Sequence, residues 1–441
     1  MIEPQLAALL MVLAFFALLL IGIPVATSLA VVGFVFGWIG FGDTLFQLLP
    51  ARLFGIVAGY QWMAIPLFVF MGVMLEKSRL ADDLLDVIGL LAGGVRGGMG
   101  VGIILFGVLM GATTGIVGAT VITLGLLTLP TLLRRGYDKG IACGAICASG
   151  TLGQIIPPSL ILILLSDIMQ LSVGTLFAAA VMPGLLLAAL YVVYLLARGA
   201  ISPSLMPPIP REERMRVDGK ALRRRLLRVV VPPLLLVFCV LGAIVGGVAA
   251  PTEAASMGAL GSVLVAWGAR RLSLQILKDV ALETSKITAI MMLILMAAQV
   301  FALSFRGLQG EELITRMFDL IPGGVNSDIW FMMLLIFVLG FFIEWIEISY
   351  IAVPLFLPVL IKQGVDPVWL AMLITVNLQS SFLTPPFGWS LFYLKGVAPP
   401  GVTITDIYRG VVPFIALQLL GLLLVFLFPE IALWLPRQIG W

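Results

Sequence analysis

The sequence predicts an all-α integral membrane protein, and its composition and its apolar runs support this prediction. Of the 441 residues, 61% are hydrophobic and 11% are charged, whereas a soluble globular protein carries about 25% charged residues. Several apolar runs, such as 6–21, 185–196 and 411–428, approach the ~20 residues with which a helix crosses a bilayer. A transmembrane β-barrel would alternate apolar and polar residues within segments of ~10 residues. These runs are continuous, so we expect helices.

The absence of histidine from the chain excludes several kinds of catalysis and metal binding. Without histidine, Ser-His and Cys-His nucleophiles and histidine proton relays cannot form. Cys143 and Cys147 lie four residues apart, and we interpret them, together with Cys239, as small apolar packing residues. An enzyme that acts on membrane lipids is therefore a distant alternative, and we predict no catalytic residue.

Hydropathy divides the chain into full spans and two longer apolar stretches. The N-terminal run lacks the preceding basic segment of a secretory signal, so we expect it to be a retained span. The stretches 101–133 and 329–361 are too long for one span and are interrupted by glycines or acidic residues. We interpret both as re-entrant helical hairpins that enter and leave on the same side. The predicted full spans are 5–22, 24–40, 62–76, 140–165, 174–197, 229–248, 252–269, 287–305, 368–393 and 410–428.

The basic residues give these spans an orientation, because cytoplasmic loops are enriched in Lys and Arg. We place the protein in a bacterial inner membrane with both termini in the periplasm. The segment 198–228 is then a basic cytoplasmic linker, able to bind anionic lipid and too short to suggest nucleic acid. Of the 26 basic residues, this topology leaves five outside, namely Arg52, Arg306, Arg316, Lys362 and Arg437.

An internal repeat relates the two halves, 1–197 and 229–441. Pro157-Pro158 of the first half recurs as Pro385-Pro386 in the second. Leu129-Pro130 and Gly136-Tyr137-Asp138 recur at the same separation along the chain, as Leu357-Pro358 and Gly364-Val365-Asp366. The first hairpin opens inward and the second opens outward, so the copies have opposite orientation. Inverted repeats with a site at the membrane midplane are typical of alternating-access transporters.

Each hairpin is followed by a span that contains one of the Pro-Pro pairs. Proline lacks the N–H donor and clashes with the preceding turn, so these helices are expected to break. Broken backbone inside a membrane occurs where it lines a cavity or is buried in protein. Its free carbonyls can bind a cation such as Na⁺, and the next half-helix N-terminus favours an anion. A simple kink in a packed helix is the alternative interpretation.

Two amphipathic stretches, 79–92 and 309–321, lie between spans and hairpins. We interpret them as interfacial helices that connect a static scaffold to a moving block, and surface packing is the alternative.

Within the second hairpin, Glu344 and Glu347 lie three residues apart and share a helix face. A carboxylate at that depth needs a cation, a proton or a hydrogen-bonding partner. The first hairpin tip, 111–120, instead offers glycines and threonines.

These motifs resemble the large membrane subunit (DctM-type) of tripartite ATP-independent periplasmic (TRAP) transporters. The resemblance covers essentially the whole chain and is strongest in 111–120, 130–139, 148–159, 364–367 and 384–392. It implies an elevator-type, Na⁺-coupled importer of organic acids, with scaffold and transport domains. It also implies two partners, a small four-helix membrane subunit and a soluble periplasmic substrate-binding protein. ATP is not expected, which agrees with the absence of a Walker A sequence.

The resemblance also suggests where ligands bind. We expect at least two Na⁺ ions, one where each hairpin tip meets its broken helix, with a carboxylate substrate between them. The substrate-binding residues predicted are Thr114, Thr151, Gln379, Ser380 and Glu347. The cation ligands predicted are Thr113, Gly115, Ser149, Gly150, Pro157, Glu344, Ser381, Thr384 and Pro385.

The chain departs from the family pattern at the second hairpin. The family commonly has one Asp followed by small residues, whereas this chain has Glu344, Trp345 and a second acid, Glu347. The run 378–382 also lacks glycine, and it is closer to the branch associated with 2-oxo acids, mannitol or chloroaromatic acids. The alternative function is a stand-alone Na⁺/anion symporter of similar inverted-repeat fold.

Overall fold

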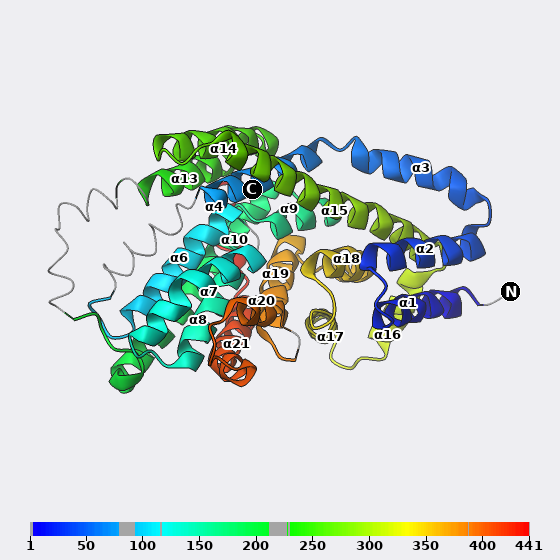
Figure 1. Cartoon of the computed structure of the whole chain (residues 1–441). Helices are drawn as coiled ribbons and strands as arrows, with labels where there is room; N and C mark the ends of the chain where they lie inside the picture. The colour runs from blue at the N-terminus through cyan, green and yellow to red at the C-terminus, as the bar shows by residue number, and fades with distance from the viewer. Residues whose placement is uncertain are drawn as a thin grey trace.

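The computed structural model describes residues 3–78, 93–114, 117–210, 227, 230–386 and 388–440, without the side chains of 61 and 112–114. These residues form helices and connecting loops (Figure 1), so the all-α prediction is confirmed. The predicted amphipathic stretch 79–92 and most of the linker 198–228 lie outside the described residues. The other amphipathic stretch, 309–321, contains α16 (Gly310–Asp319).

Most helices outside the two hairpins begin and end within a few residues of the predicted spans, but α15 (Leu274–Gly307) and α21 (Ile404–Leu427) begin earlier, and there are two additions. Those additions are α3 (Thr44–Val57) and the terminal α22 (Glu430–Gln438). Both are short, at 14 and 9 residues, so neither is long enough to be predicted as a full span. The remaining helices of this set are α1 (Pro4–Leu20), α2 (Val25–Phe41), α4 (Ala64–Lys77), α10 (Val173–Ile201), α13 (Val231–Val245) and α14 (Pro251–Gly268).

The two long apolar stretches form helical hairpins. The first consists of α6 (Gly98–Thr114) and α7 (Val117–Arg134), and the second of α17 (Val325–Leu339) and α18 (Trp345–Lys362). By length and composition alone, α7 and α18 are also among the described helices that can cross a membrane. Re-entry of the hairpins therefore stays a prediction.

Each hairpin is followed by an interrupted helix. In the first repeat α8 (Lys139–Leu152) ends and α9 (Leu160–Ile168) begins after a seven-residue gap. In the second repeat α19 (Pro367–Leu383) is followed by α20 (Trp389–Val397). The Pro-Pro pairs lie in these interruptions, and both peptide bonds within the pairs are cis. The hairpins and breaks thus lie where the sequence predicted them.

Helix packing divides the described helices into two groups (Figure 1). In the group that we call the α15 group, α15 packs on α2 and α4, and α14 packs on α4 and α13. In the α8 group, α8 packs on α6, α7 and α21, while α19 packs on α17, α21 and α9. Helix α18 belongs to the same group, because it packs on α17 and α9. The groups meet where α15 contacts α18 and where α4 contacts α6 and α9. The second hairpin therefore lies at the boundary between the groups.

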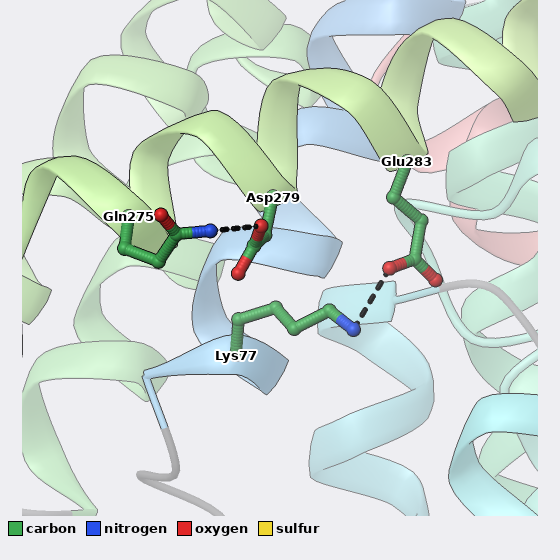
Figure 2. A network of polar contacts seen from close by, with 4 residues as sticks. All are labelled: Lys77, Gln275, Asp279 and Glu283. Carbon is green, nitrogen blue, oxygen red and sulfur yellow. Dashed lines mark hydrogen bonds and ion pairs between the residues drawn. The ribbon is translucent and has the colours of Figure 1, made fainter.

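Helix α15 is longer than the predicted span 287–305. Its 34 residues extend about 51 Å at 1.5 Å per residue. The additional first turns are polar, and in Figure 2 Gln275 donates to Asp279 at 2.8 Å while Lys77 pairs with Glu283 at 2.8 Å. Both side chains of the ion pair are about 40% exposed (38% and 41%), so its contribution is at most about 1 kcal/mol. The pair joins the end of α4 to α15.

Side-chain contacts between distant segments agree with the predicted topology. Lys139 donates from Nζ to the Gly401 carbonyl at 2.7 Å, and both residues are predicted to be cytoplasmic. Gln5 donates from Nε2 to Glu312 Oε2 at 3.1 Å, and both are predicted to be periplasmic. The assignment of each set to its side of the membrane stays a prediction.

Candidate functional site

Both hairpin tips and both interrupted helices meet at one cavity of about 200 Å³, which we call the hairpin cavity. The α15 group closes it on one side through α15. Its lining is mostly apolar and aromatic, with one carboxylate and one phenol. The lining residues are Val117, Gly118, Leu160, Ile287, Ile290, Met291, Glu344, Trp345, Ile346, Phe382 and Tyr393.

The first hairpin is held against its interrupted helix by contacts at glycine. A Cβ atom added to Gly111 would lie 2.2 Å from the Cα of Gly153, and one on Gly107 would lie 2.5 Å from the Cβ of Ser149. A Cβ on Gly150 would lie 2.3 Å from Val121 Cγ2. Only glycine allows such close approach, so the predicted cation ligands Ser149 and Gly150 do face the first hairpin.

The second hairpin repeats this contact. A Cβ atom on Gly340 would lie 2.1 Å from the Oγ of Ser381. To within one position, Gly340 and Ser381 take the places in the second repeat that Gly111 and Gly153 take in the first, so equivalent positions touch in both repeats. The Ser381 hydroxyl donates to the Leu378 carbonyl at 2.7 Å. That bond leaves an oxygen lone pair beside the tip of the second hairpin.

Tyr393 connects the two hairpin tips across the hairpin cavity. Its ring lies against Gly118, where a Cβ atom would be 3.1 Å from ring carbons. Its hydroxyl donates to Glu344 Oε1 at 3.3 Å. Glu344 is the N-cap residue of α18, and its side chain makes no capping hydrogen bond. The carboxylate is therefore directed to the cavity and to Tyr393 instead of to its own helix.

Two predicted residues of the second repeat are buried with unsatisfied polar atoms. Glu347 is 7% exposed, and its Oε2 has no hydrogen-bond partner among the described residues. Gln379 is fully buried, and neither its amide oxygen nor its amide nitrogen has such a partner. Buried polar groups are normally paired with protein, water or a ligand. Glu347 lies on α18 of the second hairpin, and Gln379 lies on α19, the helix that precedes the second break.

The structure places Thr151 away from the hairpin cavity. It is fully buried, it donates to the Ala148 carbonyl at 2.9 Å, and it accepts from Gln418 Nε2 at 3.3 Å. Ser380 and Thr384 likewise donate to carbonyls of α19, at 3.3 and 2.7 Å. None of these three side chains lines the hairpin cavity. Their predicted role in binding stays a prediction.

The remaining predicted residues lie at the breaks or at the first tip. Pro157 and Pro385 lie in the interruptions of the two broken helices. Thr113 and Thr114 are the last residues of α6, but their side chains are not described. Gly115 lies outside the described residues. Among the predicted residues with described side chains, only Glu344 lines the hairpin cavity.

Sequence reasoning missed Tyr393, Phe382 and Met291 as lining residues. Comparison of the repeats contains a signal for Tyr393, since the equivalent position of the first repeat is Leu165. Because Tyr393 carries a hydroxyl and Leu165 does not, the comparison indicates a polar contact that is made only in the second repeat. Met291 gives no such signal, because α15 lies outside the repeated hairpin and break.

The hairpin cavity can hold a small solute with an apolar body and one polar end. Tyr393 and Glu344 supply the polar atoms, and no Lys or Arg lines it among the described residues. A solute carboxylate beside Glu344 would be repelled by like charge unless a cation were bound with it. A solute carboxylate would therefore need an accompanying cation to bind in this cavity.

Comparison with known proteins gives the family. Residues 12–431 match the family described as "Tripartite ATP-independent periplasmic transporter, DctM component". The chain is 32% identical over 408 residues to the "C4-dicarboxylate TRAP transporter large permease protein DctM" of Pseudomonas aeruginosa, across 89% of this chain and 90% of that protein. It is 28% identical over 431 residues to the "Ectoine TRAP transporter large permease protein TeaC" of Halomonas elongata, across 96% and 98%.

The fold is also similar to a solved structure, the crystal structure of the Alcanivorax borkumensis YdaH transporter. The TM-score is 0.64, with 14% identity over 98% of this chain and 99% of that chain. At this identity the similarity concerns the fold alone. The family match over 12–431 is decisive: the chain belongs to the DctM family of TRAP transporter large permease subunits, which are transporters and not enzymes, as the motifs predicted.

Proposed function

We propose that the chain is the membrane-spanning translocation subunit of a Na⁺-coupled importer of small organic acids. The observation that supports this proposal is the hairpin cavity, where both tips and both interrupted helices meet. Transporters with inverted repeats bind solute and coupling ion near the midplane, at discontinuous helices. The names of the relatives, which specify a C4-dicarboxylate and ectoine, support a small organic solute.

Coupling to Na⁺ is supported by the oxygen atoms at the hairpin contacts. Na⁺ is a hard cation that prefers carboxylate, hydroxyl and carbonyl oxygens. At the second contact these are Glu344, Ser381 and the carbonyls freed at the break after Leu383. At the first contact they are Ser149 and the carbonyls after Leu152. We propose one Na⁺ at each contact, both carried with the solute.

We infer that transport moves the α8 group along the α15 group in an elevator fashion. The hairpin cavity lies on the boundary between the groups, since Ile287, Ile290 and Met291 of α15 face it. A solute held there moves with the hairpins while α15 keeps its position.

We also propose two partners, a small four-helix membrane subunit and a periplasmic substrate-binding protein. The chain is proposed to lie in a bacterial inner membrane with both termini in the periplasm.

Uptake of radiolabelled organic acids into proteoliposomes tests this proposal. The chain is reconstituted with its small subunit and binding protein, with and without an inward Na⁺ gradient. We expect accumulation only when both the Na⁺ gradient and the binding protein are present. Accumulation without the binding protein would instead indicate a stand-alone symporter, and accumulation without the gradient would contradict Na⁺ coupling.

Ser381→Ala tests the second cation position. We expect the Na⁺ concentration for half-maximal uptake to rise about tenfold. This factor assumes that losing one hydroxyl ligand of Na⁺ costs as much free energy as losing one hydrogen bond. Ser262→Ala is a matched control, because both serines are fully buried and each donates to the carbonyl three residues earlier at 2.7 Å. Equal Na⁺ dependence in both variants would remove Ser381 from the site.

A further inference from the structure

A second cavity, of about 320 Å³, lies farther along α15 from the hairpin cavity; we call it the outer vestibule. Met291 lines the hairpin cavity and Ala302 lines the outer vestibule, which separates them by about 17 Å along the helix at 1.5 Å per residue. The vestibule lies between α3, the end of α9, α15 and α18. Arg52, Asp167 and Arg306, which line it, all belong to segments predicted to be periplasmic.

The polar groups of the outer vestibule differ from those of the hairpin cavity, because two guanidinium groups line it. Arg52 forms no ion pair or side-chain hydrogen bond with the described residues. Arg306 pairs with Glu311 at 3.5 Å, and these side chains are 47% and 36% exposed, so an incoming anion can displace the pair at little cost. Asp167 also lines the vestibule, and its negative charge lowers the positive electrostatic potential that the two arginines produce there.

Tyr350 contributes a buried phenol to the lining of the outer vestibule, within electrostatic reach of Asp167. The residue is 2% exposed, it lines the vestibule, and its hydroxyl has no hydrogen-bond partner among the described residues. Tyr350 follows Glu347 by one helical turn on α18, so the vestibule reaches the second hairpin close to its tip. A buried phenol normally finds a hydrogen-bond acceptor. A carboxylate can accept from Tyr350 and pair with an arginine through two parallel bonds.

We propose that the outer vestibule binds the carboxylate of an organic anion on the periplasmic side, before the solute reaches the hairpin cavity. Arg52 and Arg306 attract the anion, and Tyr350 orients it next to the second hairpin. The identity of the anion as the transported solute rests on the proposed function, whereas anion binding itself does not. Inorganic anions share part of this chemistry, and the test separates them.

Thiol labelling of the full chain in proteoliposomes tests the vestibule without a need for transport. Cys143 and Cys147 are buried and Cys239 is exposed, so Cys239→Ala gives a background of low reactivity. Ala302→Cys then places a thiol on the vestibule wall, for impermeant methanethiosulfonate reagents of either charge. We expect the ratio of anionic to cationic labelling rates to fall about tenfold when Arg52→Gln and Arg306→Gln are added, since charged cavities change ion association rates by at least that factor.

Arg316→Gln combined with Lys362→Gln is the matched control, because it also removes two exposed basic residues that are predicted to be periplasmic but do not line the vestibule. The labelling ratio is expected to stay unchanged in this variant. An equal fall in both backgrounds, or no labelling of the Ala302→Cys thiol, would overturn the proposal. An equal fall would mean that the labelling ratio depends on the overall surface charge and not on the vestibule arginines. An absence of labelling would mean that the vestibule is closed to the periplasm.

Protection by ligands identifies the anion. We expect small organic carboxylates to slow labelling, and Arg52→Gln or Tyr350→Phe to reduce this protection, whereas chloride and sulfate at equal ionic strength protect weakly. Equal protection by sulfate would overturn the preference for carboxylate.

Uptake kinetics provide a second test. Arg52→Gln should raise the KM for uptake about tenfold at an unchanged maximal rate, because it removes one charged hydrogen bond to the anion. If the wild-type complex fails to take up any acid while protection persists, the proposed function fails and the vestibule stands.

Discussion

Gly111→Val is expected to reduce uptake about 100-fold, the size of loss that a ~1 Å misplacement of a binding group produces. The added Cβ atom would lie 2.2 Å from the Cα and 2.7 Å from the backbone nitrogen of Gly153. Backbone atoms of a packed helix cannot yield as a flexible side chain does, so the first hairpin must move away from the interrupted helix. Steady-state uptake in proteoliposomes, normalised to the amount of inserted protein, measures the effect.

Gly242→Val is the matched control for this substitution. Gly242 lies within α13, and no atom lies within 4 Å of the position of its added Cβ. Both variants bear the same cost of valine in a helix, but only the first disturbs the contact between hairpin and break. Similar uptake by the two variants would show that the close approach of Gly111 to Gly153 is dispensable.

Glu344→Gln is expected to lower Na⁺-driven uptake by at least about 100-fold, because loss of one member of a buried charge pair costs about 3–5 kcal/mol. Glutamine has the shape of glutamate and can still accept a hydrogen bond from Tyr393, so the change removes charge and little else. The Na⁺ that we propose at the second contact then lacks its carboxylate ligand. Uptake at saturating solute, measured over a series of Na⁺ concentrations, should show the loss as a weakened response to Na⁺.

Glu253→Gln provides the comparison for Glu344→Gln. Glu253 accepts from the Ala250 backbone N–H at 2.9 Å at the start of α14, on an exposed surface, and its variant should keep normal uptake. Unchanged Na⁺ dependence in Glu344→Gln, combined with a loss in Glu347→Gln, would transfer the role to the buried carboxylate with the unpaired Oε2. Unchanged uptake in both would contradict a cation site at the second tip.

The sequence alone predicted the features of the fold that local chemistry determines. A Pro-Pro pair removes two successive N–H donors from a helix, so the interruptions at Pro157 and Pro385 follow from the residues themselves. Single prolines such as Pro183 and Pro413 instead lie inside the continuous helices α10 and α21. Apolar length with a glycine or acidic interruption likewise predicted both hairpins. Helix α3 and the first turns of α15 were not predicted, because hydropathy treats Arg52 or Glu283 as loop residues. Tertiary contacts decide that they are helical.

The direction that side chains face could not be predicted in the same way. Thr151 was predicted to bind the substrate, but it lies seven residues after Gly144, on the same face of α8. A Cβ atom on Gly144 would lie 2.1 Å from the Gly410 carbonyl oxygen, so this face packs closely on α21 and Thr151 meets Gln418. Only the packing of α8 against a helix of the other repeat determines this, and no pattern within α8 indicates it.

The length of α15 has a consequence for the surroundings of the protein. Its apolar part, 287–305, extends about 28 Å at 1.5 Å per residue, close to the ~30 Å thickness of bilayer hydrocarbon. The first turns of α15, from Leu274 to Lys286, then extend about 20 Å beyond the bilayer hydrocarbon. Thickening or thinning of the bilayer acts on the apolar part, whereas dissolved salt screens the Lys77–Glu283 pair on these first turns. Lipid composition and ionic strength thus act on two separate portions of one helix.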